Sequence, residues 1–223
     1  MQINTLDSFL DKYIEGYLFT DVKTVKDSVS KDMHPGNAAY LMTGALCSGM
    51  EFLGCLLRKQ EDSAEFSSSF AFDHYCKYYL SKVDKRYTAF GILGRELIRN
   101  GIAHSFATKG RIGITRRGDR DSSHLVRYAD EGIIVINPDY LYEDFEKSYH
   151  EFVAPRIAKD GDLHSRAESN YELLKNKYNE EIERIEGAVA NKLDDWPWLY
   201  KDIPANPNTV EIIEANGDLP LVS

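Results

Sequence analysis

The sequence has few cysteines and no pattern typical of a metal centre or a membrane anchor. Its three cysteines, Cys47, Cys55 and Cys76, are widely spaced inside helical patterns. This odd number argues against a disulfide framework and a zinc site, so we expect buried free thiols, no metal and no cofactor. No apolar run approaches the roughly 18 residues that span a bilayer, and the N-terminus does not resemble a signal peptide. We therefore expect a cytoplasmic protein without a membrane partner.

Positive charge is also scarce. The 223 residues carry 27 Lys and Arg against 36 Asp and Glu, a formal net charge of −9. This charge repels nucleic-acid phosphates, so any such binding needs a local basic patch. One exists between residues 109 and 120, and we interpret it either as an RNA-backbone surface or as a solvated hairpin. The basic residues are Lys109, Arg111, Arg116, Arg117 and Arg120, of which the first four are the predicted RNA contacts.

Helical patterns dominate residues 1–108 and predict an antiparallel helical bundle. Thr5 and Thr20 are each placed to cap a helix. The central helix has a wide apolar face, which predicts burial on most of its circumference. The pattern therefore indicates a mainly α protein. The expected helices cover residues 6–18, 21–31, 37–58, 65–83 and 85–104.

The pattern changes after residue 108. A short β insertion is expected over 109–137, with strands at 111–116, 124–128 and 133–136 forming a small meander or hairpin. Residues 138–193 predict C-terminal helices: one over 140–157 after Asn137, and a polar one over 163–193 with Ser165 and Glu168 in capping-box spacing. The polar helix has a narrow apolar seam that would pack on the bundle or on a second subunit. An extended tail is expected over 194–223.

The strongest candidate for chemistry is the segment 96–106, which reads ELIRNGIAHSF. It combines Arg99, Asn100 and His104, the residue types that a metal-free phosphodiester cleavage site needs. Histidine transfers protons near neutral pH, and the arginine fork binds a phosphate and stabilises charge in its transition state. Asn100 is placed to orient His104 one helical turn away. Glu96 and Arg95 are second-tier candidates.

The spacing within this segment leaves several interpretations open. Arg99 and His104 lie roughly 140° apart on a straight helix, so they converge only if the helix bends, for example at Gly101, or if two subunits share a site. Alternatively, Asn100 and Gly101 end the helix and His104 lies in the following loop. In a further alternative, His104 is a surface histidine without a task, as we also expect for His124, His150 and His164.

The run from Arg99 to His104 resembles the Arg-x-x-x-x-His signature of the HEPN superfamily, with a polar residue directly after the arginine. The apolar MEFLGCLLR segment at 50–58 and the aromatic helix before the motif also resemble that family. The resemblance covers about residues 35–108. It implies a HEPN-like helical bundle that dimerises to build one cleft from two motifs. Many such proteins are metal-independent endoribonucleases that act as toxins or in antiphage defence, while others only bind RNA, nucleotide or protein.

The resemblance also implies roles for individual residues. His104 would be the general base or acid, Arg99 would bind the scissile phosphate, and the product would carry a 2′,3′-cyclic phosphate. Toxins of the family that pair with a nucleotidyltransferase antitoxin often have a modifiable tyrosine two residues after the histidine. Phe106 stands there in this chain. Control by nucleotide transfer at that position is therefore not expected, and any antitoxin or regulatory partner stays unidentified.

Two other functions compete with a ribonuclease. The negative net charge also fits a non-catalytic HEPN-like module that binds RNA, nucleotide or a partner. The long polar helix and the Trp196-Pro197-Trp198 segment fit a structural assembly protein. Replacing His104 with alanine separates the first function from the other two, because only a ribonuclease loses an activity.

Overall fold

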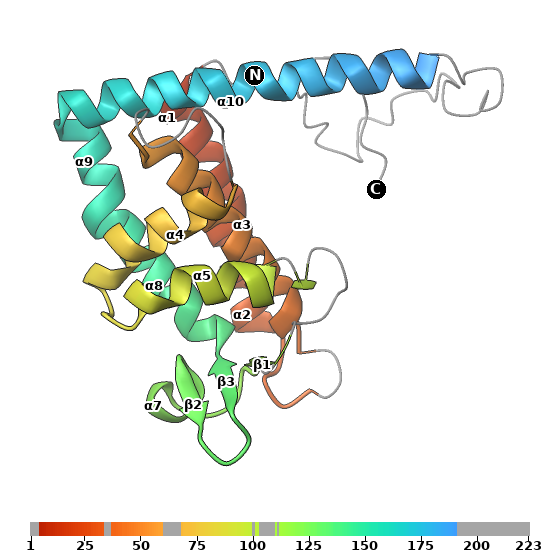
Figure 1. The fold of residues 1–223 in the computed structure, drawn as a ribbon, viewed down its shortest axis with the longest axis vertical. Coiled ribbons are helices and arrows are strands. Elements are labelled where there is room, and N and C mark those ends of the chain that lie inside the picture. Colours follow the sequence, from red (N-terminus) through yellow and green to blue (C-terminus); the bar gives the residue numbers. More distant parts are fainter. Residues whose placement is uncertain are drawn as a thin grey trace.

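The computed structural model describes residues 5–33, 37–59, 68–99, 101, 102, 110 and 112–190 (Figure 1). It confirms a mainly α protein. The first helical run joins α1 (Leu6–Phe9), the π-helical η1 (Leu10–Phe19) and α2 (Thr20–Ser28) without a break. Thr5 caps it as predicted, accepting a hydrogen bond from Ser8 N at 3.2 Å. The predicted second cap at Thr20 is wrong, because Thr20 lies within the run and its hydroxyl donates to the Glu15 carbonyl.

The central helix is α3 (Ala39–Leu57), as the wide apolar face predicts. Its core residues include Met42, Leu46, Met50 and Leu53, none more than 1% exposed. α4 (Ser68–Tyr78), the 3₁₀ turn η3 (Leu80–Lys82) and α5 (Tyr87–Leu93) follow, and α4 packs along α3. α3 is long and apolar enough to cross a membrane, judged by length and composition alone. However, 61% of this stretch is buried inside the protein, and the buried central helix of a bundle has the same length and composition. The three cysteines are buried free thiols, as predicted.

The predicted strands form at β1 (Ile112–Ile114), β2 (Val126–Tyr128) and β3 (Ile133–Ile136). Their order is β1-β3-β2. β2 and β3 form the expected antiparallel hairpin, with Val126 opposite Val135. β1 instead pairs parallel to β3, with Ile112 opposite Ile134, so a simple meander is wrong. The short helix α7 (Arg120–Ser123) lies between β1 and β2 and lengthens the connection, as parallel pairing requires.

The C-terminal part contains α8 (Pro138–Ser148), the π-helical η5 (Tyr149–Val153), α9 (Ala154–Lys159) and α10 (Gly161–Ala190). Asn137 caps α8 as predicted, accepting from Asp139 N at 3.0 Å. The predicted capping box at Ser165 is wrong, because α10 begins four residues earlier, where the Asp160 carboxylate accepts from Leu163 N.

The long helix α10 crosses one end of the bundle, and its C-terminal part extends past the bundle (Figure 1). Its first half packs on α3 and α9. Ala167, Asn170 and Tyr171 are buried there, whereas Tyr178 further along is 58% exposed. The predicted seam is thus covered by the bundle at Tyr171, whereas Tyr178 faces solvent. The predicted tail over 194–223 lies outside the described residues.

Candidate functional site

The helix that carries the predicted site is anchored on its apolar side. α5 continues into the π-helical η4 (Gly94–Arg99), and Gly101 and Ile102 are also helical. Ile98 is fully buried, and a Cβ built on Gly44 of α3 would lie 3.2 Å from Ile102 Cγ2. The apolar side of the predicted helical wheel therefore faces α3. Because residues 101 and 102 are helical, the alternative in which the helix stops at Asn100 and Gly101 is wrong.

The predicted catalytic residues are only partly described. Arg99 is the last residue of η4 and Glu96 lies within it, but the side chains of both lie outside the described part of the chain. Arg95 is half-buried. Asn100 and His104 lie outside the described residues, as does Phe106. The pairing of Arg99 with His104 therefore stays a prediction.

An irregularity does occur in this helix, but before the predicted bend at Gly101. η4 is π-helical over Gly94–Arg99, so its backbone hydrogen bonds span five residues instead of four. Such a turn holds more residues than an α-helical turn. Positions 95 and 99 therefore do not form the straight stripe that four-residue spacing gives in an α-helix. π-helical turns recur at functional sites, and here the turn ends at the candidate arginine.

The structure contradicts the predicted RNA contact by Arg116. This side chain is fully buried. Its Nε donates to Asp139 Oδ1 at 2.8 Å, and its terminal nitrogens donate to the carbonyls of Lys26, Val29 and Asn37 at 2.6 to 3.0 Å. Arg116 thus ties the start of α8 to the end of the first helical run, and it has no path to an RNA backbone.

The other basic residues of the patch are dispersed. The Arg117 side chain is 52% exposed, and it donates to the Asp32 carbonyl at 2.8 Å. Arg120 pairs with both carboxylate oxygens of Asp144 at 2.8 Å and lies over the Tyr140 ring. Lys109 and Arg111 lie outside the described residues. Within the described part of the patch, Arg117 is therefore the candidate that still faces solvent.

The expectation of a surface His124 is also wrong. His124 is fully buried in a network with Tyr87, Asp144 and Asn137. Its Nδ1 accepts from Asn137 N at 3.3 Å, and its Nε2 lies 2.8 Å from the Tyr87 hydroxyl, which donates to Asp144 at 2.9 Å. Since the single Tyr87 proton goes to Asp144, the network assigns the His124 proton to Nε2 and a neutral ring.

The pKa shifts in this network agree with that assignment. Burial lowers the pKa of His124, and the hydrogen bond to Asp144 offsets this shift only in part. Burial alone would raise the pKa of Asp144, but hydrogen bonds from His124 and Arg120 outweigh it and lower that pKa. Burial also raises the pKa of Tyr87 well above its usual value. The network therefore holds a neutral tyrosine and histidine beside an ionised aspartate.

This network positions the helix of the candidate site. Tyr87 is the first residue of α5, and its hydroxyl joins that end of the helix to α8 through Asp144 and to the β insertion through His124. Ile98 and Ile102 hold the other end against α3. Sequence reasoning missed this anchor, because Tyr87 and His124 are 37 residues apart and no local pattern pairs them.

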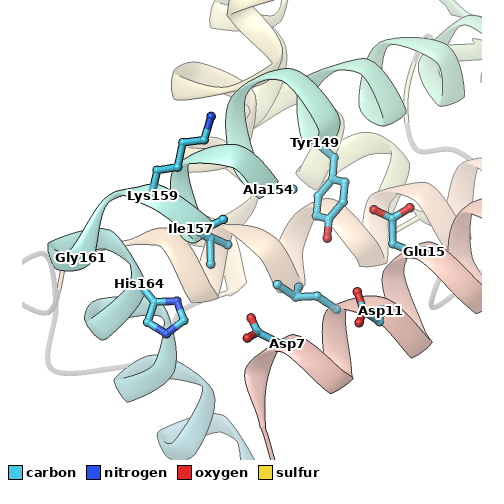
Figure 2. Close-up of a pocket in the computed structure, with 11 residues that line it drawn as sticks. Asp7, Asp11, Glu15, Tyr149, Ala154, Ile157, Lys159, Gly161 and His164 are labelled. Atoms are coloured by element: carbon cyan, nitrogen blue, oxygen red, sulfur yellow. The ribbon is translucent and has the colours of Figure 1, made fainter.

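Sequence reasoning also missed a pocket between η1 and the junction of α9 with α10. Its volume is about 660 Å³. Figure 2 shows the side chains of Asp7, Asp11, Glu15 and Tyr149 around it. Among the described residues, no group of His, Cys, Asp and Glu has the arrangement of a metal site. The four-residue spacing of the three acids was a signal in the sequence.

Comparisons with family models, curated proteins and solved structures give no match to this chain.

Proposed function

We propose that this protein is a metal-independent endoribonuclease of the HEPN type. In this proposal it acts in the cytoplasm as a homodimer with a composite site and serves as a toxin or in antiphage defence. The observation that supports it best is the anchoring of the motif-bearing helix. Ile98 and Gly101 are buried and Ile102 packs against the core, so the apolar side of this helix is fixed on the bundle.

The proposed mechanism follows from the chemistry of the three motif residues. His104 removes the proton from the RNA 2′-hydroxyl, and a second histidine, from the other subunit, protonates the leaving 5′-oxygen. Arg99 stabilises the charge that develops on the phosphate, and Asn100 orients the histidine or the phosphate. The 2′-oxygen attacks the phosphorus, so the products are a 2′,3′-cyclic phosphate and a 5′-hydroxyl.

An RNA cleavage assay in excess EDTA tests this proposal. The wild type is compared with His104→Ala and with His164→Ala as a control, since His164 lies on α10. We expect cleavage by the wild type and the control, loss of cleavage in His104→Ala, and cyclic phosphate ends. Absence of cleavage by the wild type on RNA from several sources, or cleavage that survives His104→Ala, would refute the proposal.

A non-catalytic module is the second candidate, and one observation favours it. Arg116 is buried, and Arg120 is engaged with Asp144, so the described part of the basic patch offers little surface to an RNA backbone. In this case the protein binds RNA, nucleotide or a protein partner without cutting. Saturable binding of RNA that is neither cleaved nor affected by His104→Ala would support the module.

A further inference from the structure

The pocket beside η1 has one strongly acidic wall. Asp7 in α1 and Asp11 and Glu15 in η1 succeed one another at four-residue spacing. η1 is π-helical, but all three residues line the pocket, so they form one acidic wall. In Figure 2 the three carboxylates lie along one side of the pocket.

The opposite wall presents the hydroxyl of a buried tyrosine, Tyr149. Tyr149 is only 2% exposed, and its ring packs against Phe19 and His150. Its hydroxyl has no hydrogen bond among the described residues, and Figure 2 shows it directed between Asp11 and Glu15. A hydroxyl that a buried ring directs into a pocket, without a hydrogen bond to the described residues, is placed to bond a ligand there.

The space between these walls has an apolar lining. Leu10, Ala154 and Ile157 contribute it, and Leu10 and Ile157 are buried members of the core. Lys159 also lines the pocket, but its side chain extends away from the carboxylates (Figure 2). A ligand that fits this pocket therefore carries positive charge toward the acidic wall and hydrocarbon groups toward the apolar lining.

The raised pKa of Glu15 agrees with a site that would be stabilised by an additional positive charge. Burial raises its pKa, and the carboxylates of Asp11 and Glu146 raise it further, whereas His150 lowers it. His150 Nδ1 lies 3.6 Å from Glu15 Oε1 at the outer end of the acidic wall, and His164 pairs with Glu168 at 3.3 Å at the other end. A bound cation would relieve the repulsion between the carboxylates. The net charge of −9 would also attract it.

We infer that this pocket binds a linear aliphatic polyamine. The ammonium groups would pair with Asp7, Asp11 and Glu15, and the methylene chain would cover Leu10 and Ile157. The Tyr149 hydroxyl would accept a hydrogen bond from an ammonium group. Several ammonium groups separated by short methylene chains match a wall of three carboxylates. The volume is within the range of small-molecule sites.

Isothermal titration calorimetry of the full chain with spermidine at physiological ionic strength tests this inference. The pocket variant is Asp11→Asn/Glu15→Gln. The control is Asp130→Asn/Glu131→Gln, which removes the same charge from two exposed residues in the β2–β3 turn. We expect the pocket variant to lose about tenfold or more in affinity and the control to stay within about twofold. Tyr149→Phe keeps the ring and should weaken binding by about three- to tenfold.

Three results would overturn the inference. One is no saturable binding of spermidine by the wild type. Another is an equal loss of affinity in the pocket variant and the charge control, which indicates general attraction to an acidic protein. The third is tight binding of a lysine-rich peptide where spermidine does not bind, which would assign the carboxylates to a protein partner. Because none of these assays uses RNA, their outcome is independent of the proposed ribonuclease activity.

Discussion

Arg116 shows how one buried charge can hold distant segments together. Its guanidinium joins Asp139 to three backbone carbonyls of residues 26 to 37. Removing one partner of a buried ion pair is destabilising, and here the half-exposed Lys31 is the cation that would remain beside Asp139. Arg116, which belongs to the basic patch over residues 109–120, therefore has a structural role.

Replacing Arg116 with Met should destabilise the protein by about 3–5 kcal/mol, because three backbone carbonyls lose their donor and the buried Asp139 is left with Lys31 at 2.9 Å as its cation. Urea unfolding measures the change. Arg117→Met is the matched control, since its side chain is half-exposed, and it should stay within about 0.5 kcal/mol. Equal effects of the two substitutions would contradict the buried role.

His124 should make stability depend on pH. Burial lowers its pKa in the folded state below the ordinary value of 6.5, so the unfolded chain binds the proton more readily. The free energy of unfolding should therefore fall as the pH drops below about 6.5, until the folded-state pKa is reached. The lowered pKa of Asp144 adds a loss only at more acidic pH.

The measurement is urea unfolding between pH 7.5 and 5 for the wild type and His124→Gln. The wild type should lose more stability over this range than the variant, which has no imidazole at this position. Parallel pH profiles for the two proteins would show that His124 is not responsible.

At the scale of secondary-structure elements, α3 and α4 approach so closely that one glycine decides their packing. A Cβ on Gly54 would lie 1.9 Å from the Ala71 carbonyl oxygen, whereas a Cβ on Gly161 at the start of α10 meets nothing within 4 Å. These two glycines therefore allow a matched comparison.

Gly54→Ala should cost about 1–3 kcal/mol or more, because the backbone of α4 must move away from α3. Gly161→Ala should be neutral or stabilise by up to about 1 kcal/mol, since alanine favours the helix. Thermal and urea unfolding of both variants measure the difference. A stable Gly54→Ala protein would contradict the close packing of α3 on α4.

Elements with a strong local signal were predictable, and those fixed by distant contacts were not. The apolar face of α3, the Asn137 cap and the three strands follow from local pattern. By contrast, the first helical run continues through Thr20 because Phe19 and Val22 pack into the core, and the local sequence does not show this packing. The parallel pairing of β1 with β3 is likewise set by the path through α7.

In the candidate site, too, features with a local pattern were predictable and features set by distant contacts were not. The apolar side of the motif helix was predictable from its period and is confirmed at Ile98. The buried roles of Arg116 and His124 were not predictable, because their partners lie 13 to 90 residues away in the sequence. The roles of Arg99, Asn100 and His104 stay predictions.

At the scale of the whole molecule, the proposed dimer makes a quantitative prediction. If the two His104 side chains of a dimer act as base and acid in one cleft, a mixed dimer of wild-type and His104→Ala chains lacks one of them and is inactive. After equimolar co-refolding, only about a quarter of the dimers contain two wild-type chains, so the activity should be about a quarter of that of the same amount of wild-type protein.

Cleavage assays on the mixture, with light scattering to confirm a mass of twice 25.4 kDa, measure this loss. Retention of about half of the activity in a mixture that forms dimers would show that each subunit cleaves RNA without the histidine of the other. A monomer that cleaves RNA would contradict the composite site altogether.

The anchoring of Arg116 has a consequence for anyone who shortens this chain. The carbonyls of Lys26, Val29 and Asn37 belong to the N-terminal part, yet their donor comes from the segment after β1. A fragment that stops at residue 108 would leave these acceptors unpaired and would remove the His124 and Asp144 partners of Tyr87. The β insertion is therefore part of the folded bundle, and a shortened protein should retain it even when only the motif-bearing helices are wanted.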